Sequence, residues 1–165
     1  MILDTFRSQI LFARSYTIRI LDKIPESLWF QMPQPAVTHV AWQVGHLAMA
    51  QYRLGVERIR GIKPEDASII SDEFIGLFRI QTVPQAESQI YPSPSEIRKV
   101  FDAVHQLVLS EIPTYASVDL TQPPVTPHSI CKTKSDILVW CSHHEFLHAG
   151  QIGLLRRLFG EAPIW

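Results

Sequence analysis

The segment CSHHEFLHAGQ, near the C-terminus, contains two histidines whose spacing suits the binding of a metal ion. On an α-helix, residues four positions apart lie on one face, so the imidazoles of His144 and His148 can reach a single ion. Gln151 follows on nearly the same face, whereas His143 and Glu145 each point about 100° away from it. The expected ligand-bearing face therefore carries His144, His148 and Gln151.

The same segment matches the H-E-x-x-H pattern of zinc peptidases, in which the third metal ligand comes from further along the chain. A metzincin needs glycine at position 151 and histidine at position 154, where this sequence has Gln151 and Leu154. Glu161 is the one carboxylate residue that follows the motif. The sequence therefore gives little support to a peptidase.

A third ligand is available upstream, at His46 in the string WQVGHL. Its neighbours Trp42, Val44 and Leu47 are apolar, and a buried imidazole among them needs a partner to offset the loss of hydration. From the residues alone, His46 is either a hydrogen-bonded core histidine or a metal ligand. A catalytic zinc ion usually has three protein ligands and one open position, so a third histidine would complete such a site.

Periodic apolar residues and capping signals predict four long helices that could position these side chains. In the first helix, steps of three and four separate Ile2, Phe6, Ile10, Ala13, Tyr16, Thr17, Ile20 and Leu21. Along the second, Val40, Val44, Leu47, Tyr52, Val56 and Ile59 lie broadly on one side. The expected helices span residues 2–23, 38–61, 94–112 and 133–159.

Local signals indicate where these helices begin. Ser93 is followed by a first-turn proline and by Glu96, and Thr133 is followed by Asp136, so both serve as N-caps with an acidic third position. Thr38 is the expected N-cap of the second helix. The segments 61–93 and 113–132 have poor helical periodicity or many prolines, so we expect long connections there. Residues 73–80 could make one or two helical turns. The predicted fold is all-α, an antiparallel four-helix bundle with long crossover connections, and residues 1–165 form one domain.

Composition excludes several classes of protein. The 15 basic and 16 acidic residues give a formal charge of −1, so a large nucleic-acid interface is not expected. No window approaches 18 uninterrupted apolar residues, and the N-terminus lacks the pattern of a signal peptide. We therefore expect a soluble, cytoplasmic protein with no membrane association. Cys131 and Cys141 are expected to be free thiols; packing in the core is favoured for Cys141 over a redox or metal-proximal role.

Together, these residues resemble the DinB/YfiT-like superfamily of metal-binding four-helix bundles. The resemblance rests on W42-Q-V-G-H46-L-A in the second helix and on H144-E-F-L-H148-A-G-Q151-I, followed by R156-R157-L-F-G, in the last. It implies that His46, His144 and His148 bind a divalent ion, nickel or zinc, with coordination positions left for water. It also implies a homodimer.

Three functions remain open at this point. The resemblance implies either a transferase that joins a low-molecular-weight thiol to an electrophile, which we favour, or a metal-dependent hydrolase. The third is a non-enzymatic, stress-associated bundle whose metal fixes its helices.

Glu145 and Gln151 are candidates for hydrogen bonds around the metal. The alternative for Glu145 is a solvated ion pair, and the alternative for Gln151 is a packing role. Trp42 and Trp140, one turn before His46 and His144, are expected to wall the site. His39, His105 and His128 are expected on the surface or in loops.

Overall fold

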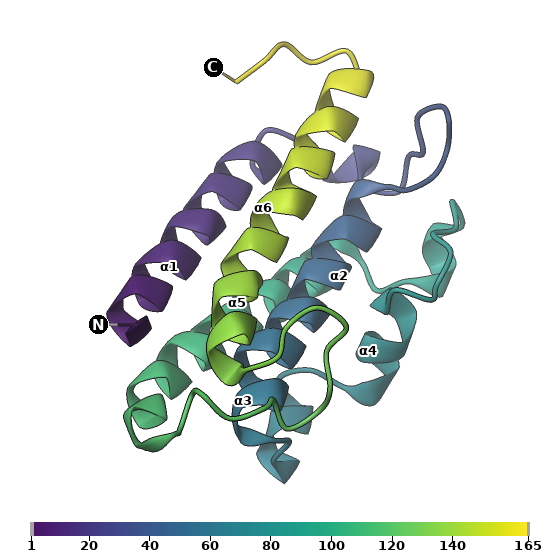
Figure 1. Ribbon diagram of the computed structural model, residues 1–165. Coiled ribbons are helices and arrows are strands. Elements are labelled where there is room, and N and C mark those ends of the chain that lie inside the picture. The colour runs from purple at the N-terminus through teal and green to yellow at the C-terminus, as the bar shows by residue number, and fades with distance from the viewer. Residues whose placement is uncertain (1, 165) are drawn as a thin grey trace.

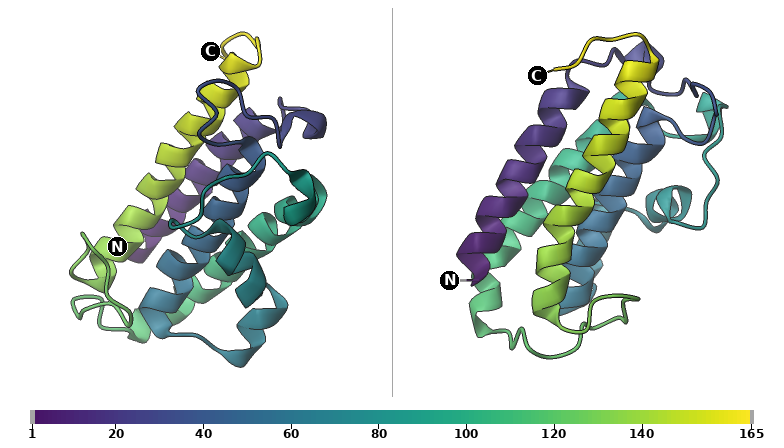
Figure 2. Two further views of the ribbon diagram at one scale, coloured as in Figure 1. Left: turned by 90° about the vertical axis from the view of Figure 1, so that its right-hand side faces the viewer. Right: turned by 45° about the horizontal axis from the view of Figure 1, so that its top comes forward.

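The computed structural model describes residues 2–164, which form helices joined by irregular segments (Figure 1). No strand occurs among these residues, so the predicted all-α class is confirmed. Four long helical stretches lie side by side in all the views of Figures 1 and 2. They are α1 (Ile2–Leu21), α2 (Val40–Tyr52) with its continuation to Arg60, α5 (Pro94–Glu111) and α6 (Lys134–Leu158).

Shorter elements lie in the connections, and one of them extends α2. A π-helical segment, Arg53–Glu57, joins α2 to the single turn of α3 (Arg58–Arg60), and Gly61 ends this stretch with a φ of +86°. The expected turns near residues 73–80 are α4 (Asp72–Phe78). The remaining described helices are of the 3-10 type: Glu26–Leu28, Pro64–Ser68, Ser88–Ile90 and Ile112–Ser117. None of the helices within residues 2–164 has the length and apolar character needed to cross a bilayer.

The predicted capping boxes begin α5 and α6. The Ser93 hydroxyl accepts a hydrogen bond from the Glu96 amide, and the Glu96 carboxylate accepts one from the Ser93 amide at 2.8 Å. The Thr133 and Asp136 pair repeats this exchange at the start of α6. Because the N-cap fixes where a helix starts, it also fixes which way the histidines face about three and four turns later on α6.

The start of α2 differs from the prediction by one residue. His39, not Thr38, is the N-cap, and its Nδ1 accepts a hydrogen bond from the Trp42 amide at 3.1 Å. Thr38 instead accepts a hydrogen bond from the side-chain amide of Gln43 at 3.0 Å. His39 was expected on the surface or in a loop; it lies at the end of the loop before α2 but is fully buried.

The α2 helix lies at the centre of the fold. It packs against α4, α5 and α6, and every residue from Val40 to Tyr52 is buried, whereas the sequence predicted one buried side. Gly45 permits the close approach of α4, because a Cβ atom there would lie 2.4 Å from the ring of Phe78. This contact brings the Phe78 backbone beside His46, which follows Gly45.

His105, on α5, is also buried rather than on the surface, with 5% of its side chain exposed. No described residue hydrogen-bonds its Nδ1, and burial, with a smaller effect of Arg14, lowers its pKa to about 3. The unfolded chain, with a histidine pKa of about 6.5, takes up a proton as the pH falls, while folded His105 does not until about pH 3. The free energy of unfolding therefore falls with decreasing pH in this range.

We expect the loss of stability between pH 7 and pH 5 to be about 2 kcal/mol smaller in His105→Gln than in the unaltered protein. Glutamine keeps a polar side chain of similar size but cannot titrate. Urea unfolding of both proteins at the two pH values measures the difference. Identical pH dependences would show that His105 is not held neutral in the folded state.

Candidate metal centre

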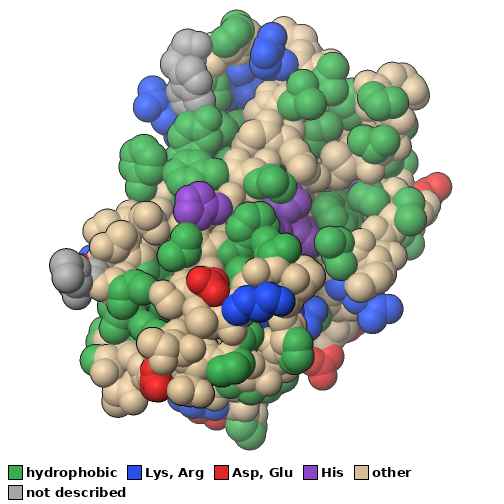
Figure 3. Space-filling model, viewed as in Figure 1, with side chains coloured by type: hydrophobic (Ala, Val, Ile, Leu, Met, Phe, Trp, Pro, Cys, Tyr) green, Lys and Arg blue, Asp and Glu red, His purple; other side chains and the backbone are tan. Residues whose placement is uncertain are grey.

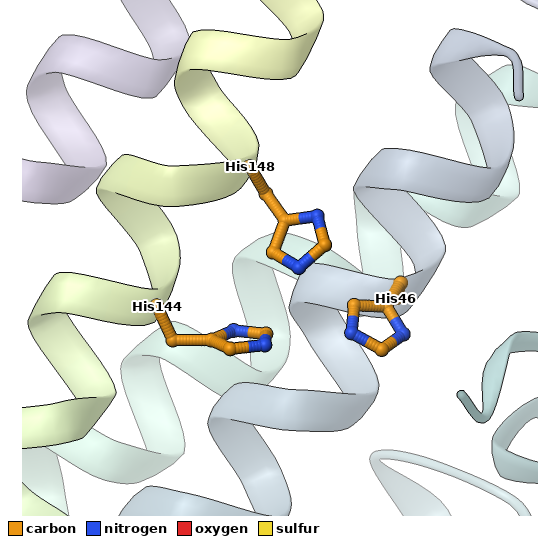
Figure 4. A group of neighbouring side chains, drawn as sticks. All are labelled: His46, His144 and His148. Atoms are coloured by element: carbon orange, nitrogen blue, oxygen red, sulfur yellow. The ribbon is translucent and has the colours of Figure 1, made fainter.

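Three histidine side chains converge between α2 and α6 (Figure 4). One ligand nitrogen from each of His46, His144 and His148 lies within 4.8 Å of the other two. Two nitrogens bound to one tetrahedral zinc ion at about 2.05 Å lie about 3.3 Å apart, so small side-chain rotations would complete the geometry. The residues thus fit a divalent ion, and the i,i+4 spacing predicted on α6 places two of the three.

Hydrogen bonds orient two of these imidazoles. Nδ1 of His46 lies 2.8 Å from the backbone oxygen of Phe78, and Nδ1 of His148 lies 2.6 Å from Oε1 of Gln43. Both oxygens are acceptors, so each Nδ1 must carry the proton and each Nε2 keeps a free lone pair. The side-chain nitrogen of Gln43 donates to Thr38, and its oxygen faces His148. The tautomers that metal binding requires are therefore set by the protein.

Burial keeps all three imidazoles neutral at pH 7. Loss of hydration, reinforced by the neighbouring histidines, lowers the pKa of His144 to about 4 and that of His148 to about 2. Burial also lowers the pKa of His46, although its hydrogen bond to Phe78 opposes the shift. A neutral imidazole is the form that binds a metal ion, so protons do not compete for this site near neutral pH.

Aromatic side chains wall the cluster, as expected. The Trp42 ring stacks on His46 with centroids 4.7 Å apart and an angle of 14° between the planes, and Trp140 meets His144 edge-on at 5.9 Å. His144 is partly exposed, so the site is not sealed from solvent. Figure 3 shows histidine side chains reaching the surface among hydrophobic ones on the face that carries α1 and α6.

Glu145, the glutamate of the H-E-x-x-H match, points away from the histidines into the core. It accepts hydrogen bonds from Arg14 at 2.8 Å and from Gln51 at 3.1 Å, and 2% of its side chain is exposed. This ion pair is buried, so the expectation that Glu145 forms a solvated ion pair is wrong. Both oxygens of Glu145 have partners outside the cluster, so the expected hydrogen bond near the metal is not formed.

Other residues singled out in the sequence lie outside the cluster. Gln151 is on the expected face of α6, but no described residue hydrogen-bonds its amide. His143 is exposed and bonds the Val139 backbone oxygen, and His128 lies in the loop before α6. Cys141 is a free, buried thiol whose pKa is raised mainly by burial, which leaves it unreactive.

Sequence analysis missed the residue that orients His148. Gln43 lies three residues before His46, but its bond crosses from α2 to α6, and no spacing within one helix reveals such a contact.

We expect Gln43→Leu to weaken divalent-metal binding by about 10- to 100-fold, because His148 loses the acceptor that holds its Nδ1 proton. The same change at Gln151, which bonds neither α6 histidine, should alter the affinity by less than about twofold. Zinc titrations of both variants by calorimetry make the comparison. If Gln151→Leu has the larger effect, the hydrogen-bond assignment is wrong.

Comparison with known proteins identifies the family. A search of curated proteins finds no match to this sequence. The family model of the DinB superfamily matches residues 9–152, a span that includes all three histidines and most of the chain. The chain therefore belongs to the DinB superfamily.

Proposed function

We propose that His46, His144 and His148 bind one divalent ion, nickel or zinc, and leave coordination positions open for a small molecule. The observation that carries this proposal is the convergence of three neutral imidazoles, two of them held in the ligand tautomer. Within residues 2–164, the group contains no fourth His, Cys, Asp or Glu ligand. Three protein ligands are typical of catalytic zinc, whereas structural zinc usually has four.

We further propose that the protein is a metal-dependent enzyme that transfers a low-molecular-weight thiol to an electrophilic small molecule. A divalent ion in such a site lowers the pKa of a bound thiol or water and so supplies a nucleophile near neutral pH. The buried ion pair of Glu145 with Arg14 favours thiol transfer over hydrolysis, because it withholds the carboxylate that zinc peptidases use as a general base. Trp42 and Trp140 would limit the approach of water to the reacting group.

A panel of cellular thiols, offered with 1-chloro-2,4-dinitrobenzene as the acceptor, tests this activity. We expect turnover that requires added divalent metal and is lost in His46→Ala, with His143→Ala as the matched control that retains it. Metal-dependent ester hydrolysis without thiol transfer would favour the hydrolase instead. Inactivity in both assays, together with a metal shell closed to water, would favour the non-enzymatic role.

The finer architecture is part of the same proposal. We infer that α1, α2 with its continuation, α5 and α6 form an antiparallel four-helix bundle; the long connections at residues 61–93 and 118–133 support this topology. We also infer a homodimer, supported by apolar side chains such as Phe12 and Leu147 that are more than half exposed on α1 and α6. Light scattering should give twice 18.8 kDa, and an 18.8 kDa species alone at high concentration would contradict it.

A further inference from the structure

A cavity of about 430 Å³ lies beside the three histidines, between α2, α6 and two loops. This volume is within the range of small-molecule sites. The loop before α2 and the loop after α4 both contribute prolines to its walls. The lining residues are Pro33, Pro35, Val37, Thr38, Trp42, Gln43, Pro84, Gln151, Leu154, Leu155 and Leu158.

This cavity and the histidine cluster share two side chains. Trp42 lines the cavity and stacks on His46, and Gln43 lines the cavity and bonds His148 at 2.6 Å. Gln151, on the same face of α6 as His144 and His148, is the next wall residue along that helix. A molecule in the cavity would therefore lie next to the proposed metal ion rather than on a remote surface.

The lining of this cavity contains no charged side chain. Four other cavities of similar size each include charged residues, such as Arg156 and Arg157 in one and Lys63 and Asp72 in another. An ionised group that enters an uncharged, apolar cavity loses its hydration without gaining a partner. In the metal-free protein, the cavity therefore selects against charged ligands.

Four side chains in the lining carry polar groups, and those of Thr38, Trp42 and Gln43 already have hydrogen-bond partners. The amide of Gln43 bonds both His148 and Thr38, so its oxygen and its nitrogen each already have a partner. The amide of Gln151 has no described partner. It can donate to or accept from one polar group of a ligand.

We propose that this cavity binds an uncharged, mainly apolar organic molecule, aromatic or branched aliphatic, with one hydrogen-bonding group that faces Gln151. The role of this cavity as the acceptor site for thiol transfer rests on the proposed function. Its assignment as a binding site does not depend on that function. The cavity limits the electrophile to uncharged molecules, whereas the three histidines alone place no limit on the charge of the electrophile.

Binding of N-phenyl-1-naphthylamine, an uncharged apolar fluorophore, tests the site in metal-free and zinc-loaded protein. We expect saturable binding that Leu158→Asp weakens at least about tenfold, because the variant places a charge at the cavity wall. Val139→Asp is the matched control: Val139 is exposed to a similar extent on the same helix, 43% against 48% for Leu158, but lies outside the cavity. Val37→Asp, in the loop before α2, repeats the test without a change in any helix.

Displacement of the fluorophore defines the ligand class. 1-Naphthalenemethanol and 1-naphthoate have the same ring but differ in charge, and in the metal-free protein, where no ion can attract the carboxylate, we expect it to compete at least about tenfold more weakly. Equal competition by the two compounds would overturn the proposal. Absence of saturable binding, or unchanged affinity in both Leu158→Asp and Val37→Asp, would do the same.

These outcomes separate the cavity from the metal site. If the fluorophore binds as expected but the protein takes up no metal, the proposed function fails and the cavity assignment stands. If metal binds but the aspartate variants leave fluorophore binding unchanged, the cavity assignment fails alone. In an active preparation, Leu158→Asp should raise the KM for an apolar electrophile and keep kcat within about twofold of the unaltered protein. An unchanged KM would show that the cavity is not the acceptor site.

Discussion

Replacement of His148 by alanine is expected to abolish the binding of one divalent ion per chain. His148 supplies one of three ligands, and the two that remain give an incomplete site whose affinity should fall by at least about a thousandfold. The same loss is expected in His46→Ala and His144→Ala. Elemental analysis of purified protein and zinc titration by calorimetry measure occupancy and affinity.

The matched control is His143→Ala. His143 lies on the same helix as two of the ligands, but its exposed ring bonds the Val139 backbone oxygen and does not join the cluster. This variant should bind metal as the unaltered protein does. Occupancy that stays unchanged in all three ligand variants would rule out the site. A loss in His143→Ala as large as in His148→Ala would show that the ligand set is wrong.

The second large effect is on stability. Arg14, with 4% of its side chain exposed, donates to Glu145 at 2.8 Å, to Gln51 at 2.9 Å and to the Phe101 backbone oxygen at 2.8 Å. Burial lowers the pKa of Arg14, and the attraction of Glu145 opposes that shift. These bonds join α1 to α2, α5 and α6. Removal of Glu145 leaves the buried Arg14 cation with one carboxylate, that of the half-exposed Asp102 at 3.9 Å.

We expect Glu145→Leu to lower the free energy of unfolding by about 3–5 kcal/mol, measured by urea unfolding with a chelator present. Arg14→Met combined with Glu145→Leu should recover most of this loss, because no charge then remains buried. As a control, Arg98→Met removes two more exposed ion pairs, with Asp22 and with Asp102, and should cost less than about 1 kcal/mol. A Glu145→Leu variant within 1 kcal/mol of the unaltered protein would show that the pair contributes little.

Signals within single helices predicted much of this fold. The capping boxes at Ser93 and Thr133 gave the starts of α5 and α6, because the residues that form them are close in sequence. The i,i+4 spacing of His144 and His148 likewise predicted their common direction. The π-helical segment Arg53–Glu57 was not predicted, and the start of α2 was predicted one residue too early.

Contacts between helices could not be predicted in this way. The residues alone left His46 as either a core histidine or a ligand, because its partners are on α6 and at the end of α4. Gln43 and Gln51 gave no local signal for bonds that reach across the fold. Arg14 did give a local signal. It lies four residues after Ile10 and interrupts the apolar stripe of α1, which indicates a buried partner for its charge.

X-ray absorption at the zinc K edge, on protein loaded with one equivalent of zinc, tests the proposed centre most directly. The account predicts three imidazole nitrogens at about 2.0–2.1 Å, one or more oxygens from water, and the loss of one imidazole in His46→Ala. A sulfur ligand at about 2.3 Å in the absence of added thiol, or a shell of four protein ligands, would contradict it.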